Sequence, residues 1–182
     1  TTWRESCDRE VNMVRSSVGV ADVSTLGKID IQGKDAARFL DLVYTNTFSN
    51  LPVGRVRYGL MLREDGLVMD DGTTARLGEN HYLMTTTTAG AGLVMRHLDF
   101  VHQAFCADWD VRFISVTEAW AQFAIAGPMA RDLLNATLDA PLGEIPFMGY
   151  GTVQVGGVTA RLFRISFSGE IGFEIAVPTR YG

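Results

Sequence analysis

The order of strand-like and helical segments is the feature that most constrains the fold of this chain. Apolar residues recur at helical spacing in four stretches, and short strand-like stretches lie between them. Glycine-containing turns at residues 64–66 and 156–157 join neighbouring strands as hairpins. Because no regular strand–helix–strand alternation occurs, the sequence disfavours a doubly wound parallel sheet. It predicts an α+β fold with mostly antiparallel sheets and interspersed helices.

The expected elements follow each other along the whole chain. The expected helices cover residues 7–18, 36–44 and 94–105 and a segment opened by Gly127-Pro128, with the proline at its first position. The expected strands cover residues 28–32, 58–62, 67–69, 73–77, 81–86, 111–116, 121–126, a pair around 156–157, and 173–177.

This order suggests a two-lobed molecule. We expect two interleaved lobes, about residues 1–50 with 115–182, and 51–114, with the polar loop 46–56 as a crossing between them. The chain begins inside a helical pattern and ends directly after a strand-like run. We therefore expect it to be a fragment of a longer polypeptide.

Composition narrows the class of function. The 182 residues carry a formal net charge of −5 with scattered basic residues, so nucleic acid is not an expected partner. No apolar stretch approaches the roughly 20 residues of a membrane span, and the N-terminal residues lack a signal-peptide layout. Neither Cys7 and Cys106 nor His81, His97 and His102 show metal-ligand or disulfide spacing, so we expect no metal and a cytoplasmic location.

A pair of adjacent acids, Asp70-Asp71, follows the first hairpin. Adjacent strand residues point to opposite faces, so one of the two carboxylates faces inward. Because Asp71-Gly72 is also common turn chemistry, the pair is either a turn or cap, or a proton-handling group.

Two further segments have both a structural and a functional interpretation. Glu174, between Phe173 and Ile175, belongs either to a solvated strand face or to a carboxylate site that binds the N–H donors of an amino-pyrimidine edge. The four threonines at 85–88 either cap a helix, with Thr88 as the candidate N-cap, or line a pocket.

Four of these segments together resemble the glycine-cleavage aminomethyltransferase (T-protein) family. They are residues 17–27 (SVGVADVSTLG), 66–71 (GLVMDD), 127–128 (GP) and 167–174 (FSGEIGFE), in the family's order. Within that family, residues 22–33, 39–46 and 84–88 are most similar to the C-terminal region of heterotetrameric sarcosine oxidase alpha subunits. T-proteins typically carry His-Met where this chain has Thr25-Leu26, and tyrosine where it has Phe167 and Ala75.

The resemblance implies a tetrahydrofolate site. The second acid of the pair lies near the folate N10 atom in the family, which assigns that catalytic role to Asp71. The last acid of the GFE run holds the pterin ring, which assigns that role to Glu174. Positions that line the folate pocket are occupied here by Tyr58, Leu26, Thr87 and Phe167.

The implied activity is that of an enzyme acting as part of a sarcosine oxidase. The one-carbon unit of oxidised sarcosine would reach tetrahydrofolate here and give 5,10-methylene-tetrahydrofolate. Flavin, on a partner beta subunit, and NAD would lie elsewhere in the assembled enzyme, and the isolated fragment would be inactive. The alternatives are a stand-alone folate-dependent aminomethyltransferase or methyltransferase, and a non-catalytic folate-binding or interface module.

Overall fold

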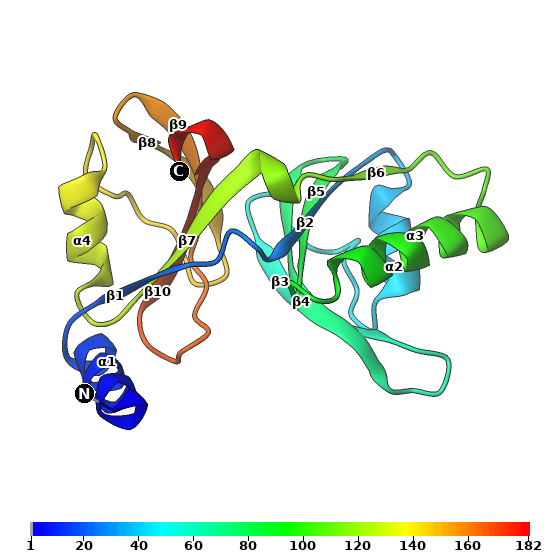
Figure 1. Ribbon diagram of the computed structural model, residues 1–182. Coiled ribbons are helices and arrows are strands. Elements are labelled where there is room, and N and C mark those ends of the chain that lie inside the picture. Colours follow the sequence, from blue (N-terminus) through cyan, green and yellow to red (C-terminus); the bar gives the residue numbers. More distant parts are fainter. Residues whose placement is uncertain (1) are drawn as a thin grey trace. The chain divides into compact units, whose positions relative to one another are not determined.

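The computed structural model describes residues 2–182, which form two five-stranded antiparallel sheets and four α-helices (Figure 1). This confirms the α+β prediction with antiparallel sheets. The helices are α1 (Trp3–Ser16), α2 (Ala36–Val43), α3 (Ala91–Phe105) and α4 (Ala130–Thr137). The strands are β1 (Gly19–Asp22), β2 (Gly27–Gln32), β3 (Val56–Leu62), β4 (Val68–Gly78), β5 (His81–Thr86), β6 (Arg112–Ser115), β7 (Trp120–Ala126), β8 (Tyr150–Val155), β9 (Val158–Phe163) and β10 (Gly172–Pro178).

The chain divides into two compact units, each with its own sheet and core. The first unit consists of the residues up to Ser24 together with Ala119–Gly182, and the second consists of Thr25–Glu118. The sequence-based lobe limits differ, because residues 25–50 and 115–118 lie in the second unit and not in the first. The reason is long-range pairing: β2 pairs with both β5 and β6. The loop 46–56 therefore lies within the second unit and is not a crossing between the two.

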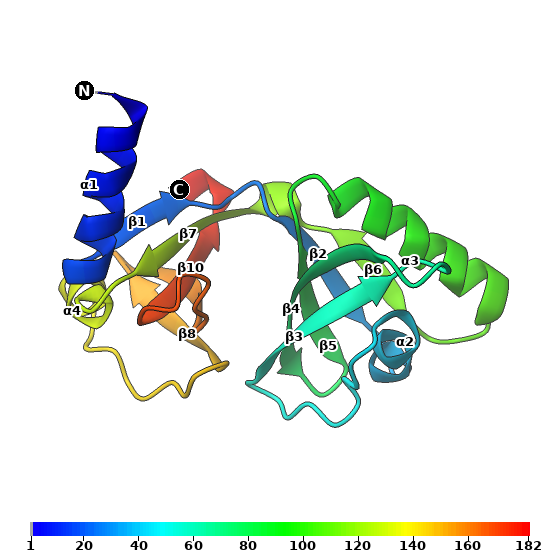
Figure 2. The same ribbon diagram turned by 90° about the horizontal axis from the view of Figure 1, so that it is seen from below.

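The second unit is a sheet with both of its helices on one face. The strand order is β3-β4-β5-β2-β6, with β3 and β6 at the edges. Figures 1 and 2 show α2 and α3 on the same side of this sheet. Alternate strand residues such as Ile29, Ile31 and Met84 pack there against Phe39 of α2 and Leu98 of α3, all at most 1% exposed. The opposite face of this sheet carries Tyr58 and Asp71.

The first unit has the strand order β1-β7-β10-β9-β8, with α4 packed on one face. Its core combines Ala130 and Leu134 of α4 with Ile125, Leu162 and Phe173 of the sheet. The fourth helix begins at Ala130, with Met129 as its N-cap, and so begins two residues later than the sequence suggested. The reason is the backbone of Met129, whose φ of −94° and ψ of 12° are not helical.

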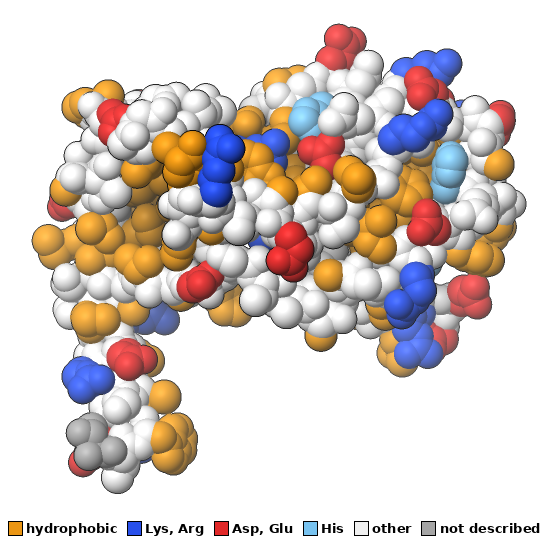
Figure 3. Space-filling view, turned by 45° about the horizontal axis from the view of Figure 1, so that its top comes forward, with side chains coloured by type: hydrophobic (Ala, Val, Ile, Leu, Met, Phe, Trp, Pro, Cys, Tyr) orange, Lys and Arg blue, Asp and Glu red, His pale blue; other side chains and the backbone are white. Residues whose placement is uncertain are grey.

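Helix α1 contributes no buried residue to either core. It begins with a capping box, in which the Thr2 hydroxyl accepts from the Glu5 backbone N–H and the Glu5 carboxylate accepts from the Thr2 N–H. Several of its apolar side chains are exposed, among them Trp3 at 74% and Val11 at 56%, while Val14 is half-buried beside Gly19. Figure 3 shows hydrophobic side chains along this helix at the lower left. The expected apolar stripe is thus exposed at Cys7 and Val11 and half-buried at Val14, and its last member, Val18, lies beyond the helix and packs against the core of the first unit.

Residues 2–182 contain no helix long and apolar enough to cross a membrane. In the same range, no group of three or more His, Cys, Asp or Glu side chains is arranged to hold a metal ion.

Candidate functional site

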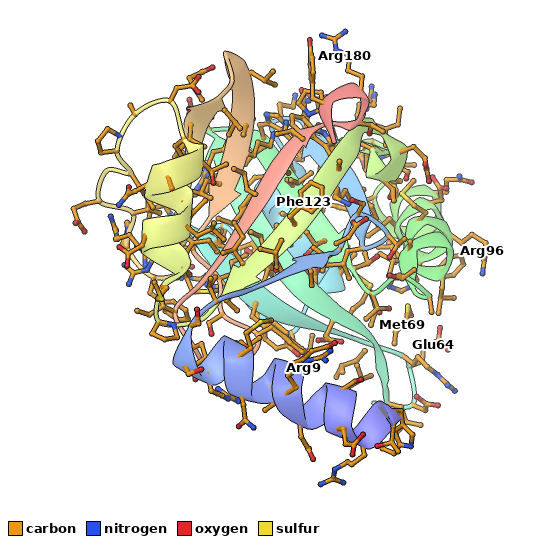
Figure 4. The ribbon with its side chains drawn as sticks, turned by 60° about the vertical axis from the view of Figure 1, so that its left-hand side comes forward. Arg9, Glu64, Met69, Arg96, Phe123 and Arg180 are labelled. Carbon is orange, nitrogen blue, oxygen red and sulfur yellow. The ribbon has the colours of Figure 1, made fainter. Side chains whose placement is uncertain are left out.

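The acid pair lies inside a strand and not in a turn. Strand β4 runs without interruption from Val68 through Asp70 and Asp71 to Gly78, and Met69, just before the pair, is labelled in Figure 4. A Cβ on Gly72 would lie 2.1 Å from the Thr85 carbonyl oxygen on β5. Gly72 therefore permits a close approach of two strands, and the turn interpretation of Asp71-Gly72 is wrong.

Asp70 is a structural acid that ties β4 to the start of α3. It is 7% exposed and shares the helix-covered sheet face with its register partner Met61. Its carboxylate accepts from the Thr87 hydroxyl at 2.6 Å and from the Thr87 N–H at 3.1 Å. The Thr87 hydroxyl in turn accepts from the Gly90 N–H at 3.0 Å. These contacts give the first acid of the pair a structural role.

Replacing Asp70 by alanine is expected to lower the free energy of unfolding by about 2–4 kcal/mol, because two hydrogen bonds to a buried carboxylate are lost. Chemical denaturation of the 182-residue chain, followed by circular dichroism, measures this loss. Asp70→Asn keeps one acceptor oxygen and should lose less. An unchanged denaturation midpoint in Asp70→Ala would show that this tie does not stabilise the fold.

Asp71 lies on the opposite sheet face and is half-buried. It pairs in register with Leu60, and Tyr58 lies two residues along β3 on the same face. The Tyr58 hydroxyl donates to Asp71 Oδ2 at 2.7 Å. This hydrogen bond is the main reason that the pKa of Tyr58 is raised, with burial and the Asp71 charge adding to it. Among the described residues, Asp71 Oδ1 has no hydrogen-bond partner, so it remains open to a ligand.

A buried tyrosine lies close to the acid pair. Burial raises the pKa of Tyr44 to about 12; the Thr74 hydroxyl opposes this shift, and the charges of Asp70 and Asp71 add to it. The ring fits against Gly59, where a Cβ would lie 2.8 Å from Tyr44 Cδ1. At neutral pH the Tyr44 side chain is therefore uncharged, and its ring is packed against Gly59.

Thr87 and Leu26 lie at the same end of the second sheet. Gly27 of β2 pairs with Thr86 of β5, and the hydroxyls of Thr25 and Thr88 lie 3.1 Å apart. The predicted N-cap role of Thr88 is wrong, because Gly90 occupies the N-cap of α3 without a side-chain cap. Thr87 supplies the hydroxyl to the Gly90 N–H instead, since the chain makes one more turn before the helix begins.

Glu174 lies in the first unit, on β10, with its side chain on the face opposite to Phe173 and Ile175, which belong to the core. The Gln122 side-chain amide donates to Glu174 Oε2 at 2.6 Å. Gln122, 1% exposed on β7, was not found from the sequence. The alternation of side chains along the strand could have indicated it. Neighbouring Phe123, labelled in Figure 4, packs against the core, so Gln122 points to the other face of the sheet, as Glu174 does.

The segment that carries Phe167 is an ordered loop between β9 and β10. The Ser166 hydroxyl donates to the Glu170 carbonyl at 2.6 Å and accepts from the Gly169 N–H at 3.1 Å. Arg15 of α1 donates to the Ser168 carbonyl at 2.9 Å and to the Glu170 carboxylate at 2.7 Å. The Phe167 ring is fully exposed at the tip. Glu170 is thus an anchor of the loop.

The predicted site residues fall into both units. Asp71, Tyr58, Thr87 and Leu26 lie in the second unit, where Asp71 and Tyr58 are in contact. Glu174 and Phe167 lie in the first unit. Each unit therefore presents one carboxylate with a neutral hydrogen-bond donor on one of its oxygens. The donor orients each carboxylate, and the open Oδ1 of Asp71 can accept an N–H group from a ligand.

The comparisons with known proteins agree with these motifs. The protein family described as the GCVT N-terminal domain matches residues 1–182. The sarcosine oxidase subunit alpha of Rhizobium meliloti (strain 1021) is 55% identical over all of this chain, which spans 19% of that protein. An aminomethyltransferase of Thermus thermophilus is 36% identical over 89% of this chain and 45% of its own length.

Two solved structures share the fold. The glycine cleavage system aminomethyltransferase T from Bartonella henselae superimposes with a TM-score of 0.84 at 25% identity, over 96% of this chain and 45% of that chain. A chain of the heterotetrameric sarcosine oxidase from Corynebacterium sp. U-96 gives a TM-score of 0.61 at 14% identity, over 97% of this chain and 86% of that chain. This chain thus spans about a fifth of the sarcosine oxidase alpha relative and less than half of the aminomethyltransferases.

Proposed function

The chain belongs to the GCVT N-terminal domain family, and from this premise we propose that it is the folate-binding part of a sarcosine oxidase alpha subunit. The observation that carries the proposal is the 55% identity to such a subunit along the whole chain. Identity to the aminomethyltransferase of Thermus thermophilus is lower, at 36%. The proposed reaction moves the one-carbon unit of oxidised N-methylglycine to tetrahydrofolate.

The residues present fit a reduced folate. A pterin ring offers adjacent N–H donors, and a carboxylate such as that of Glu174, whose Oε2 accepts from the Gln122 amide, is the type of group that recognises them. A secondary amine such as folate N10 needs a carboxylate with an open oxygen, and Asp71 Oδ1 is such an atom. In this proposal Leu26 and Thr87 of the second unit line the ligand beside Asp71, and Phe167 remains a predicted ligand contact of the first unit.

The proposed chemistry balances as follows. N-methylglycine loses two electrons and two protons and becomes the imine CH2=N–CH2–COOH. Tetrahydrofolate, when bound, supplies the N5 and N10 amines, and both nitrogens become bonded to the methylene carbon. The C=N bond of the imine breaks. The two amine protons go to the nitrogen of glycine, which leaves. Asp71 orients N10 and accepts its proton on the way to glycine. Without folate, water would take the place of the amines and formaldehyde would leave.

The oxidation itself is proposed to take place outside this chain. The sequence has no dinucleotide-binding glycine motif, so the flavin that accepts the electrons is assigned to a partner beta subunit, and NAD to another part of the assembly. The proposed partners are therefore the other sarcosine oxidase subunits, and the proposed location is the cytoplasm. A second candidate function, a stand-alone aminomethyltransferase, is favoured only by the 36% identity to that class.

The product assay of the assembled enzyme tests this proposal. With methyl-labelled N-methylglycine and saturating tetrahydrofolate, we expect most of the label in 5,10-methylene-tetrahydrofolate, and in formaldehyde when folate is omitted. Label that leaves only as formaldehyde in both cases would refute the transfer. The 182-residue chain alone should show no oxidation of N-methylglycine, because the electron acceptor lies elsewhere.

A further inference from the structure

We propose that Tyr58 is a positioning residue, whose hydroxyl fixes Asp71 so that Oδ1 is presented to the folate amine. This inference rests on the proposed function, because it assigns the amine as the group that Asp71 meets. Its basis is the contact of 2.7 Å between the Tyr58 hydroxyl and Asp71 Oδ2. Tyr58 would thus act through its hydroxyl group as well as through its ring.

Strand geometry makes this contact specific to a long side chain. Asp71 pairs with Leu60, so Tyr58 is its diagonal neighbour on β3. Diagonal neighbours lie about 7–8 Å apart, a distance that aromatic and other long side chains can span. Tyrosine also has only two side-chain torsions, so it can hold the carboxylate at little entropic cost.

Asp71 depends on Tyr58 for its orientation. Within residues 2–182, the Tyr58 hydroxyl is the one hydrogen-bonding partner of this carboxylate. The orientation of Asp70, in contrast, does not depend on Tyr58, because the Thr87 hydroxyl and N–H both donate hydrogen bonds to its carboxylate. Loss of the Tyr58 hydroxyl would leave the second acid free to rotate.

The protonation state of Tyr58 agrees with its role as the hydrogen-bond donor to Asp71. The pKa of Tyr58 is raised above its usual value, chiefly by the hydrogen bond to Asp71, so the phenol stays protonated and acts as the donor at neutral pH. The phenol is 48% exposed on an edge strand, so its removal does not open a core cavity. Tyr58→Phe is therefore a clean variant that removes one oxygen atom.

A double-mutant cycle in the assembled enzyme tests the inference. Tyr58→Phe should slow formation of 5,10-methylene-tetrahydrofolate about tenfold through misplacement of Asp71, with folate affinity changed by less than about threefold. In an Asp71→Asn background, the same change should have less than about a twofold further effect, because the proton-accepting carboxylate that Tyr58 orients is already absent. Tyr181→Phe, another exposed tyrosine, is the matched control and should leave the rate unchanged.

The outcomes separate this inference from the proposed function. Equal losses from Tyr58→Phe in both backgrounds would mean that Tyr58 acts on folate directly, and no loss in the wild-type background would mean that it has no role; either result overturns the inference alone. A wild-type rate in Asp71→Asn would instead overturn the role of Asp71, and with it the inference.

Discussion

Replacing Asp71 by asparagine in the assembled enzyme is expected to lower the rate of 5,10-methylene-tetrahydrofolate formation by about 100-fold or more, the usual range for loss of a general base. Asparagine keeps the shape of the side chain and an oxygen that can accept from Tyr58, but it cannot take up a proton. Oxidation of N-methylglycine should continue, because the proposed function assigns it to another part of the assembly. The one-carbon unit should then leave as formaldehyde.

The measurement is the ratio of labelled methylene-tetrahydrofolate to labelled formaldehyde at saturating folate. Asp65→Asn, an exposed acid in the turn before β4, is a matched control for the loss of one negative charge. It should leave the ratio unchanged. A wild-type ratio in Asp71→Asn would remove Asp71 from the mechanism and favour a binding or interface role for the second unit.

Local patterns in the sequence were sufficient to predict most of the elements. Alternation correctly placed the two acids on opposite faces of a strand, and it placed Glu174 opposite to core residues Phe173 and Ile175. The turn interpretation of Asp71-Gly72 failed because the close approach of the Thr85 carbonyl depends on strand pairing, which a local pattern does not contain.

The misplaced lobe limits have the same cause. Strand β2 follows the first unit directly in sequence, yet it pairs with β5, about fifty residues later, and with β6. The Tyr58–Asp71 and Gln122–Glu174 contacts also depend on register between strands, since each joins diagonal neighbours. Sequence motifs could thus identify the carboxylates, but only the pairing of strands could identify the residues that orient them.

Replacing Glu174 by glutamine is expected to weaken binding of tetrahydrofolate to the assembled enzyme by about 100-fold. Each hydrogen bond to a charged group contributes about 1.5–3 kcal/mol, and 1.4 kcal/mol corresponds to tenfold in affinity. Glutamine also places an N–H group against the N–H donors of the ring, so one contact becomes repulsive. Titration calorimetry or quenching of protein fluorescence with tetrahydrofolate gives the dissociation constant.

Two further variants distinguish three causes of weaker folate binding: loss of the contact between Glu174 and the ligand, loss of a negative charge, and loss of the Gln122 amide that orients Glu174. Glu144→Gln removes an exposed carboxylate of the same unit and should leave the dissociation constant unchanged. Gln122→Met removes the amide that donates to Glu174 Oε2 but keeps a similar volume, and it should weaken binding about tenfold because the carboxylate is no longer oriented. If Glu174→Gln binds folate as tightly as the wild type, the pterin ring is held elsewhere. The Gln122–Glu174 pair would then be a tie between β7 and β10 and not a recognition element.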